Sequence, residues 1–552
     1  MYRQVIDPVS HSLGLSAIFA ALPLLVLFVL LGVVRLTAWI SSLISLVVAL
    51  IVATVVYPMP VAQAGLAATL GAAFGLFPIL WIVVNAIWIY NMTVETGHFD
   101  VLRRSFSRVS DDHRVQAVII AFCFGALMEA LAGFGTPVAI TAVMLIALGF
   151  PPMRAATIAL VANTAPVAFG ALAVPITTLS KVANIGVHPL GSMVGRQTPI
   201  LAVFVPLVLV AIVDGRRGVR QAWPAALVGG VAFGIAQYVT SNFISVPLTD
   251  IVASLFAAGC VVLLLRVWQP AESVLVGGGI TAPQPVAGGA VDSTDAGFQR
   301  RVTHPDPPAE EFRAYAPYLI IIVIFVIAQL GPVAHVLDSV TKSFNWPGMH
   351  LQTPAGKPST LPVFKFNWLT AAGSLMLIAG LVTIPVLKLS PARAVRAYGA
   401  TLRQLRWAII TVMAVLAIAF VMNASGQTAT LGNWMAGAGK AFAVLSPILG
   451  WLGVAVTGSD TSSNSLFGAL QVTAANKAHL DATLMAASNS SGGVLGKMIS
   501  PQNLAIAAAA VGLTGKEGDI LRKVLLWSLV FLAGMCLLVL LQSTSLLSWM
   551  VP

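Results

Sequence analysis

The chain has 552 residues, of which 58% are hydrophobic and only 9% are charged, whereas soluble domains carry roughly 25% charged residues. This composition excludes a soluble globular protein and indicates an integral membrane protein. Lys and Arg outnumber Asp and Glu by 30 to 19, but they gather in short connections between apolar segments. The sequence therefore offers no soluble basic domain that would bind nucleic acid.

Residues 1–98 are predicted to form N-terminal transmembrane helices. The apolar runs at 14–34 and 37–57 are each long enough to cross roughly 30 Å of hydrocarbon as a helix. The residue alternation of a lipid-facing barrel is absent. The first run also exceeds the roughly 7 to 15 residues of a signal-peptide core, so we expect it to be retained as a span. Over the whole chain we expect an all-α polytopic membrane protein with about 12 to 14 transmembrane helices.

The basic residues predict which connections are cytoplasmic. They cluster in four connections, at 103–114, 214–220, 388–406 and 516–523. By the positive-inside rule, these connections face the cytoplasm.

A long segment rich in Gly, Pro and Ala predicts the division of the chain. Residues 269–314 have the composition of a flexible linker, which we expect on the cytoplasmic side. The linker separates a first half, 99–268, from a second half, 315–552. A shorter polar stretch, 339–367, falls on the outer side when crossings are counted from the basic connections.

The two halves show a weak internal likeness. Setting 163–177 against 489–503 without a gap aligns four pairs of similar residues at a constant offset of 326 positions: Asn163 with Asn489, Thr164 with Ser490, Gly170 with Gly496, and Pro175 with Pro501. Counting crossings from the basic connections gives the corresponding helices opposite directions. We therefore predict two inverted halves, each with interrupted or re-entrant helices, as in many secondary transporters.

Polar and Gly-rich breaks interrupt the apolar segments in four places, at 133–137, 163–166, 458–465 and 488–503. Irregular backbone at membrane depth is tolerated only where protein or a water-filled cavity surrounds it. The helix N-termini at such breaks present free N–H groups and about half a positive charge. Close helix packing alone explains a single Gly, but it does not require a carboxylate such as that of Asp460. We therefore expect the breaks to form one site for an anion.

Three ionisable residues stand out in the apolar segments: Glu129, Asp460 and Lys497. Each costs roughly 2.5 to 3.5 kcal/mol at a helix centre, which makes it a functional candidate. Glu129 shares a helix face with Gly125 and Gly133, so it points into protein. Because burial favours the neutral form of a carboxyl group, Glu129 and Asp460 are candidates for proton coupling; the alternative is a buried ion pair with Lys497. Lys497 either neutralises a bound anion or extends to the interface on its long stem.

The substrate contacts are expected from small and polar residues of the breaks. The candidates are Gly135, Thr136, Asn163, Thr164, Thr461, Ser462, Asn464, Asn489, Ser490, Ser491, Lys497 and Gln502. The stretch 492–497 resembles a phosphate loop but is one residue short, and Met498 stands where Ser or Thr would coordinate magnesium. The breaks contain no His, and no HExxH motif occurs. The sequence therefore predicts no enzyme, no cofactor and no metal site.

Three of these stretches resemble the bacterial lactate permease family: "GALMEALAGFGTPVAITAVMLIALGF" (125–150), "TGSDTSSNSLFGALQ" (457–471) and "GGVLGKMISPQNLAIAAAAVGLTGKE" (492–517). The resemblance extends over nearly the whole chain. It implies a multi-pass protein of the bacterial plasma (inner) membrane, surrounded by lipid, that imports L-lactate, D-lactate or glycolate together with protons. It also implies, by fold analogy, a substrate domain that moves against a scaffold, in an elevator-like motion.

From these expectations a binding mode follows as a hypothesis. A 2-hydroxymonocarboxylate lies between the interrupted regions. Its carboxylate contacts helix N-termini and the side chains of Asn163, Asn489, Ser490 and Lys497. Thr136 or Ser462 contacts its hydroxyl group, and Glu129 or Asp460 takes the proton. The alternative is a sodium-coupled organic anion carrier, in which Asp460 and its hydroxyl neighbours form a cation site.

Overall fold

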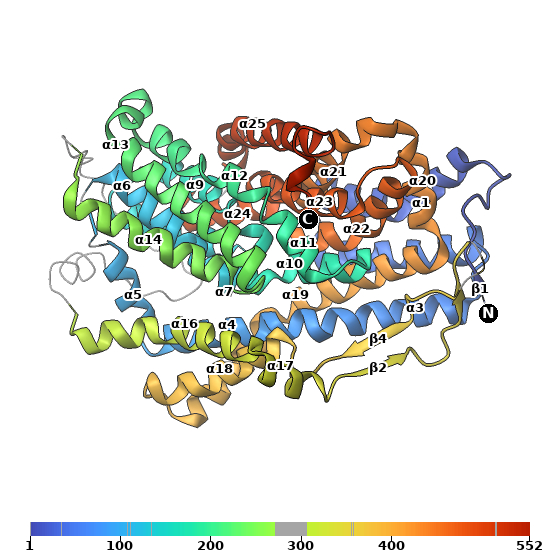
Figure 1. Ribbon diagram of the computed structural model, residues 1–552, viewed down its shortest axis with the longest axis horizontal. Helices are drawn as coiled ribbons and strands as arrows, with labels where there is room; N and C mark the ends of the chain where they lie inside the picture. Colours follow the sequence, from blue (N-terminus) through green and yellow to red (C-terminus); the bar gives the residue numbers. More distant parts are fainter. Residues whose placement is uncertain are drawn as a thin grey trace.

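The computed structural model describes residues 2–34, 36–107, 109–110, 112–133, 135–270, 306–354, 356, 358–513 and 516–552. Helices make up almost all of this structure (Figure 1), as the apolar composition predicts. Most of the predicted linker, 269–314, lies outside the described residues. Helix α16 (Pro308–Gln329) already begins before the predicted end of that linker.

The number of membrane spans is lower than expected when it is counted by length and apolar composition. Within the described residues, ten helical segments pass that test, or up to eleven if the pair Pro152–Ala162 and Val167–Ala183, bent by 63°, is one span. The apolar helices Thr136–Ala147 and Ala372–Val386 are too short to pass. The count of about 12 to 14 spans is therefore not confirmed, and the inverted relation of the halves stays a prediction.

The N-terminal region consists of long helices that continue through π-helical turns. Helix α1 begins after Ser12, whose side chain accepts a hydrogen bond from the Leu15 backbone N–H and so satisfies one of the free donors of the first turn. The elements of this region are β1 (Tyr2–Arg3), α1 (Leu13–Phe28), η1 (Val29–Val33), α2 (Ala38–Ile51), η2 (Val52–Val56), α3 (Val61–Phe74), η3 (Gly75–Leu80) and α4 (Trp81–Glu95).

The first half contains two interrupted helices at predicted breaks. Helix α7 ends before Gly133, and α8 begins after Gly135, whose φ of +84° suits glycine. The elements are α5 (His98–Ser107), α6 (His113–Gln116), η4 (Ala117–Phe124), α7 (Gly125–Ala132), α8 (Thr136–Ala147), α9 (Pro152–Ala162), η5 (Val167–Phe169), α10 (Gly170–Ala183), α11 (Val187–Val194), α12 (Thr198–Ala202), α13 (Val205–Val239), η6 (Thr240–Ile244) and α14 (Thr249–Val267).

In the second half, the two breaks are shorter than predicted. Only Gly458 and Ser459 separate α21 from α22, and α23 stays helical through Gly496. Asn489 and Ser490 of α23 bond to side chains of α22. The elements are α16, α17 (Gly331–Asp338), β2 (Lys342–Asn345), β3 (Leu351–Gln352), β4 (Val363–Phe366), α18 (Ala372–Val386), α19 (Pro391–Ser425), α20 (Gln427–Met435), η7 (Ala436–Ala441), α21 (Phe442–Thr457), α22 (Asp460–Lys477), α23 (Ala482–Gly496), η8 (Lys497–Ile499), α24 (Pro501–Ala510), α25 (Glu517–Gln542) and η9 (Ser548–Met550).

Two small sheets, which were not predicted from the sequence, accompany the helices in the described residues. β1 pairs in parallel with β3, and β2 pairs with β4 in antiparallel register. Three of these strands lie in the polar stretch 339–367, and Figure 1 shows β2 and β4 together along α3. The first residues of the chain are thereby attached to the polar stretch of the second half.

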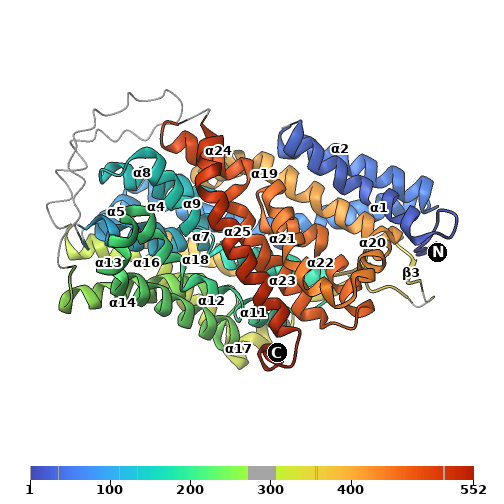
Figure 2. The same ribbon diagram turned by 90° about the horizontal axis from the view of Figure 1, so that it is seen from above.

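Glycines bring α21 and α23 into backbone contact. A Cβ atom at Gly450 would lie 1.9 Å from the carbonyl oxygen of Asn489, and one at Gly492 would lie 2.2 Å from that of Pro447. Figure 2 shows α21, α22, α23 and α25 as one group of neighbouring helices. This close packing brings the polar residues of α22 and α23 against each other inside the protein.

Candidate functional site

A large cavity lies where the interrupted helices meet. Its volume is about 1130 Å³, above the roughly 300 to 1,000 Å³ of typical small-molecule pockets. The rim includes the exposed residues Leu36 and Trp407. The floor includes the buried side chains of Glu129, Asp460 and Lys497. The cavity therefore leads from the surface to the three ionisable residues that the sequence singled out.

Glu129 and Lys497 form an ion pair at the floor. The Nζ of Lys497 donates to Oε1 of Glu129 at 2.6 Å, and Nδ2 of Asn163 donates to Oε2 at 2.9 Å. A Cβ atom at Gly170 would lie 2.9 Å from Oε1, so glycine leaves room for the carboxylate. The buried ion pair, which the sequence analysis kept as the alternative, is present, and Lys497 does not extend to the interface. Among the described residues that line the cavity, Lys497 is the single Lys or Arg.

Asp460 occupies the first turn of α22 and has one satisfied and one unsatisfied oxygen. Ser490 and Asn464 donate to Oδ2, the latter at 3.3 Å. Oδ1 is buried and has no hydrogen-bond partner among the residues that the structure describes. Ser459 caps the same helix by accepting from the backbone N–H of Ser462. The carboxyl group is thus fixed at the cavity floor with one oxygen available to a proton or another ligand.

A chain of amides supports Asp460 from behind. Nδ2 of Asn464 also donates to the Pro175 carbonyl oxygen at 3.2 Å, and its Oδ1 accepts from Asn489 at 2.8 Å. Asn489 in turn accepts from Gln471 at 3.0 Å. Asn464 therefore links α22 to the first half of the chain. Gln471, which the sequence analysis did not single out, belongs to the same network.

The structure divides the predicted substrate contacts into two groups. Four of them line the cavity: Thr461, Ser462, Lys497 and Gln502. The other eight are not among the described residues that line it: Gly135, Thr136, Asn163, Thr164, Asn464, Asn489, Ser490 and Ser491. Three of these eight, Asn163, Asn464 and Ser490, bond to the carboxyl groups instead. Their polarity positions the ionisable residues of the site.

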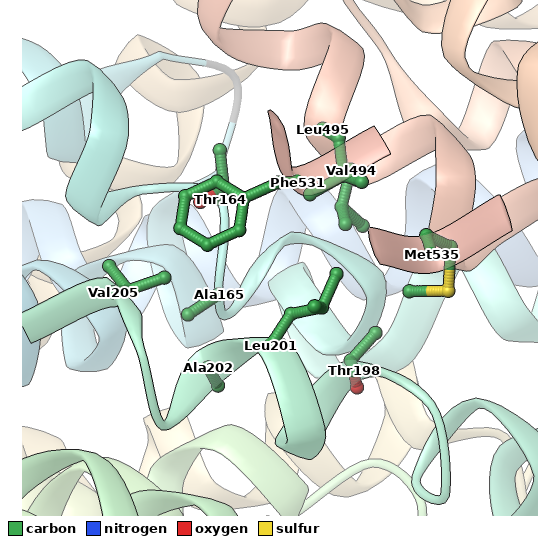
Figure 3. A pocket seen from close by; sticks show the side chains of 10 residues that line it. All are labelled: Thr164, Ala165, Thr198, Leu201, Ala202, Val205, Val494, Leu495, Phe531 and Met535. Atoms are coloured by element: carbon green, nitrogen blue, oxygen red, sulfur yellow. The ribbon is translucent and has the colours of Figure 1, made fainter. Parts of the chain in front are cut away.

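Thr164 lines a different and much smaller cavity, shown in Figure 3. Its volume is about 10 Å³, which is room for about one water molecule. Most of the labelled side chains are apolar, and they come from both halves of the chain, with Leu201 from α12 and Phe531 from α25. This cavity is too small for an organic substrate.

Asp250 is a buried carboxyl group that the sequence analysis missed. It lies in the first turn of α14 and is fully buried. Oδ1 accepts from Nε2 of Gln237 at 3.0 Å, whereas Oδ2 has no partner. The only sequence signal was an acidic residue near the start of an apolar run, where an exposed helix cap is the ordinary interpretation.

The described residues contain no group of three or more His, Cys, Asp or Glu side chains that could hold a metal ion. The cavity wall instead combines the ammonium group of Lys497, the carboxyl groups of Glu129, Asp460 and Glu517, and hydroxyl groups that include those of Thr461 and Ser462. The N-termini of α22 and α24 also open onto the cavity, since Ser459 and Pro501 line it. Such a set of groups can bind a small anion and exchange protons.

The family model and the similar proteins agree on one family of permeases. The family model described as L-lactate permease matches residues 16–546. The L-lactate permease of Escherichia coli strain K12 is 41% identical, with 100% of each chain covered, and that of Bacillus subtilis strain 168 is 39% identical with the same coverage. The glycolate permease GlcA of Escherichia coli strain K12 is 41% identical over 96% of each chain.

Two solved transporter structures show distant similarity. The YdaH transporter of Alcanivorax borkumensis aligns over 84% of each chain with a TM-score of 0.40 and 14% identity. MtrF of Neisseria gonorrhoeae, from a class of antimetabolite efflux pumps, aligns over 87% of this chain and 83% of its own with a TM-score of 0.45 and 12% identity. The apolar helices and the bacterial permease relatives identify a multi-pass protein of the bacterial inner membrane.

Proposed function

This chain belongs to the L-lactate permease family, and on that premise we propose that it imports lactate and glycolate by symport with protons. The family consists of permeases, so the chain is a transporter and not an enzyme. The observation that carries the proposal is the Lys497–Glu129 ion pair at the floor of the cavity.

Lys497 is the group that attracts the substrate carboxylate. It is the one basic residue on the described cavity wall, and a charge-assisted hydrogen bond contributes about 1.5 to 3 kcal/mol. Millimolar affinity requires only about 4 kcal/mol, so Lys497 together with a helix N-terminus and one hydroxyl group suffices. Thr461 and Ser462 supply hydroxyl groups beside it.

Proton coupling follows from competition for Lys497. When Glu129 is ionised, it already neutralises the ammonium group at 2.6 Å. A second carboxylate would leave one uncompensated negative charge in a poorly hydrated place, which is costly. Protonation of Glu129 removes that charge and frees Lys497 for the substrate. One proton therefore binds with each monoanion.

Asp460 is the second candidate for the proton. Its buried Oδ1 without a partner gives a proton, or a sodium ion in the alternative mechanism, a place to bind. In contrast to Glu129, it has no Lys or Arg ion pair among the described residues. In the part of the chain that the structure describes, the direct partner of Lys497 is Glu129, so the occupancy of Lys497 depends first on Glu129, and we assign the coupling to Glu129.

The energetics favour a pH-driven carrier. One proton and one monoanion together carry no net charge, so the membrane potential, which contributes about 2.3 kcal/mol per charge per 100 mV, does not act on the loaded carrier. Each pH unit across the membrane supplies about 1.4 kcal/mol. Uptake is expected to rise as the outside becomes more acidic.

The test is uptake of labelled lactate and glycolate into proteoliposomes that contain the purified protein. A pH gradient, a sodium gradient and a membrane potential are imposed one at a time. Accumulation with an alkaline interior alone, unaffected by potential, is the expected result. Accumulation that requires sodium would overturn proton coupling and assign Asp460 to a cation site. Absence of transport of either acid under all gradients would overturn the proposed substrates.

A further inference from the structure

The buried carboxyl group of Asp250 has no place in the mechanism given so far. It is 0% exposed, and no Lys, Arg or His forms an ion pair with it among the described residues. Burial of an ionised carboxylate without a cation is strongly unfavourable, so such a group holds a proton. Within the described part of the chain, its side chain accepts one hydrogen bond, from Gln237, which is also fully buried.

Two groups of hydrogen bonds, one at Asp250 and one at Glu129, meet in the break at 163–166. Gln237 donates to Asp250 and also, at 3.3 Å, to the carbonyl oxygen of Ala165. Ala165 lies in the same break as Asn163, which donates to Glu129. Helix α14, which carries Asp250, packs against α7, which carries Glu129. Asp250 therefore lies behind Glu129, within the polar surroundings of the same break.

Several buried polar atoms in this region have no protein partner. Besides Oδ2 of Asp250, they are Oδ1 of Asn163, Oγ1 of Thr240 and Oγ of Ser245. Buried polar atoms of this kind ordinarily bind water. Ser245 lies between Asp250 and the exposed side chain of Phe243 in the chain, and Thr240 lies three residues before Phe243. These atoms mark the turn between α13 and α14 as the place where water would approach Asp250 from the surface.

The turn between α13 and α14, residues 240–248, lies on the side of the protein opposite the mouth of the cavity. From the basic stretch 214–220, α13 and η6 run to residue 244, which at 1.5 Å per residue is roughly 40 Å, and α14 returns beside α13 (Figures 1 and 2). The cavity mouth, in contrast, includes Trp407 and Gly518, next to the basic stretches 388–406 and 516–523. By the positive-inside rule the mouth faces the cytoplasm and Asp250 faces outward.

The charged groups around Asp250 are few. Of the elements packed against α14, α7 contributes Glu129, α13 contributes the neutral Gln237, and α10 carries Lys181, which is exposed. The Arg residues of α13 lie at 216–220, well before Gln237, and Arg266 lies in the last turn of α14. His188 of α11 is near the outer turn, where its Nε2 lies 3.1 Å from the Asn242 carbonyl oxygen. Glu129 is therefore the ionisable partner of Asp250.

We propose that Asp250 is a second proton-binding residue of the transporter, which receives a proton from the outer side and passes it to Glu129. The O–H bond on Asp250 breaks as an O–H bond forms on Glu129, through water held at Oδ1 of Asn163. Asp250 is then reprotonated from the outer solution, and no electrons are transferred. The proposal rests on the proton symport proposed above.

The test compares two modes of transport in proteoliposomes that contain Asp250→Asn. Exchange of internal for external lactate moves the loaded carrier back and forth and requires no new proton, whereas accumulation driven by a pH gradient requires one proton per substrate. We expect exchange to stay within about twofold of wild type and pH-driven accumulation to fall at least about tenfold, since a positioned proton-transfer group typically contributes more than that. Asp250→Glu, which keeps the acid, is expected to restore part of the accumulation.

The matched control is Ser254→Ala on the same helix. Ser254 is 1% exposed and donates to the Ile251 carbonyl oxygen. A hydroxyl group does not take up a proton near neutral pH, so lactate exchange and pH-driven accumulation are both expected to persist in this variant. Equal loss of exchange and accumulation in Asp250→Asn would indicate a structural role and overturn the proposal. Unchanged accumulation in a protein whose wild type is driven by pH would overturn it as well. If the wild type itself does not respond to pH, the proposed symport fails first.

Discussion

Lys497 contacts a carboxylate of the protein in the state described here, and this contact makes Glu129→Gln informative. The variant keeps the size of the side chain but leaves the Lys497 ammonium group without its counter-charge. Loss of one partner of a buried pair typically costs 3 to about 5 kcal/mol, and we expect a smaller loss because the cavity borders Lys497. Lactate exchange is expected to persist and pH-driven accumulation to disappear.

Thermal unfolding independently measures the loss of the Lys497 counter-charge in Glu129→Gln. Lactate should raise the unfolding temperature of Glu129→Gln more than that of the wild type, because the substrate carboxylate replaces the missing charge. Asp460→Asn serves as the comparison, since its carboxyl group has no ion pair among the described residues and lactate should give no extra stabilisation. If Glu129→Gln still accumulates lactate in response to pH, the coupling role moves to Asp460.

A second prediction concerns the substrate carboxylate itself. Lys497→Met preserves much of the length of the side chain without the charge, and loss of a charge-assisted hydrogen bond of about 1.5 to 3 kcal/mol should raise the Kd for lactate about 10- to 100-fold. Equilibrium binding of labelled lactate to the purified protein measures this change. Lys497→Arg keeps the charge with a different shape and should bind better than the Met variant. Equal affinity of the Met variant and wild type would remove Lys497 from the site.

Among the elements, the contact of α21 with α23 has the most restrictive geometry. In Gly450→Ala the new methyl group would meet the Asn489 carbonyl oxygen at 1.9 Å, so the helices must separate, at a cost of about 1 to 3 kcal/mol. Because α22 and α23 carry Asp460 and Ser490, transport should decline along with thermal stability. Gly259→Ala in α14 is the control, as no described atom lies within 4 Å of its Cβ position. If both variants unfold at the same temperature, the contact of α21 with α23 does not require glycine at 450.

The interrupted helices and the buried charges could be predicted from the sequence, whereas the partners of the polar residues could not. Glu129 and Asp460 were identifiable because an ionisable residue in an apolar run is rare. Asn163 and Ser490 were expected to contact substrate, but they donate to those carboxyl groups, and cross-helix pairing cannot be read from one sequence. Asp250 was missed because its burial depends on the packing of α14 against α13 and not on the local pattern.

For the whole molecule, the cavity predicts access from one side of the membrane. Ser462 lies on the cavity wall, so a Ser462→Cys variant should react with a membrane-impermeant thiol reagent faster in inside-out than in right-side-out vesicles. The native cysteines, Cys123, Cys260 and Cys536, are first replaced by serine. Lactate is expected to slow the reaction. Faster reaction from the outer face would reverse the assigned orientation of the cavity.

The parallel pairing of β1 with β3 also constrains how the chain is made. Tyr2 donates hydrogen bonds to the carbonyl oxygens of Tyr57 and Ser425, and Arg3 pairs with Gln352. During synthesis these contacts cannot form until the ribosome has completed most of the polypeptide. Residues 2 and 3 must therefore wait, unpaired with these partners, while later helices insert, and their attachment is a late step of biogenesis.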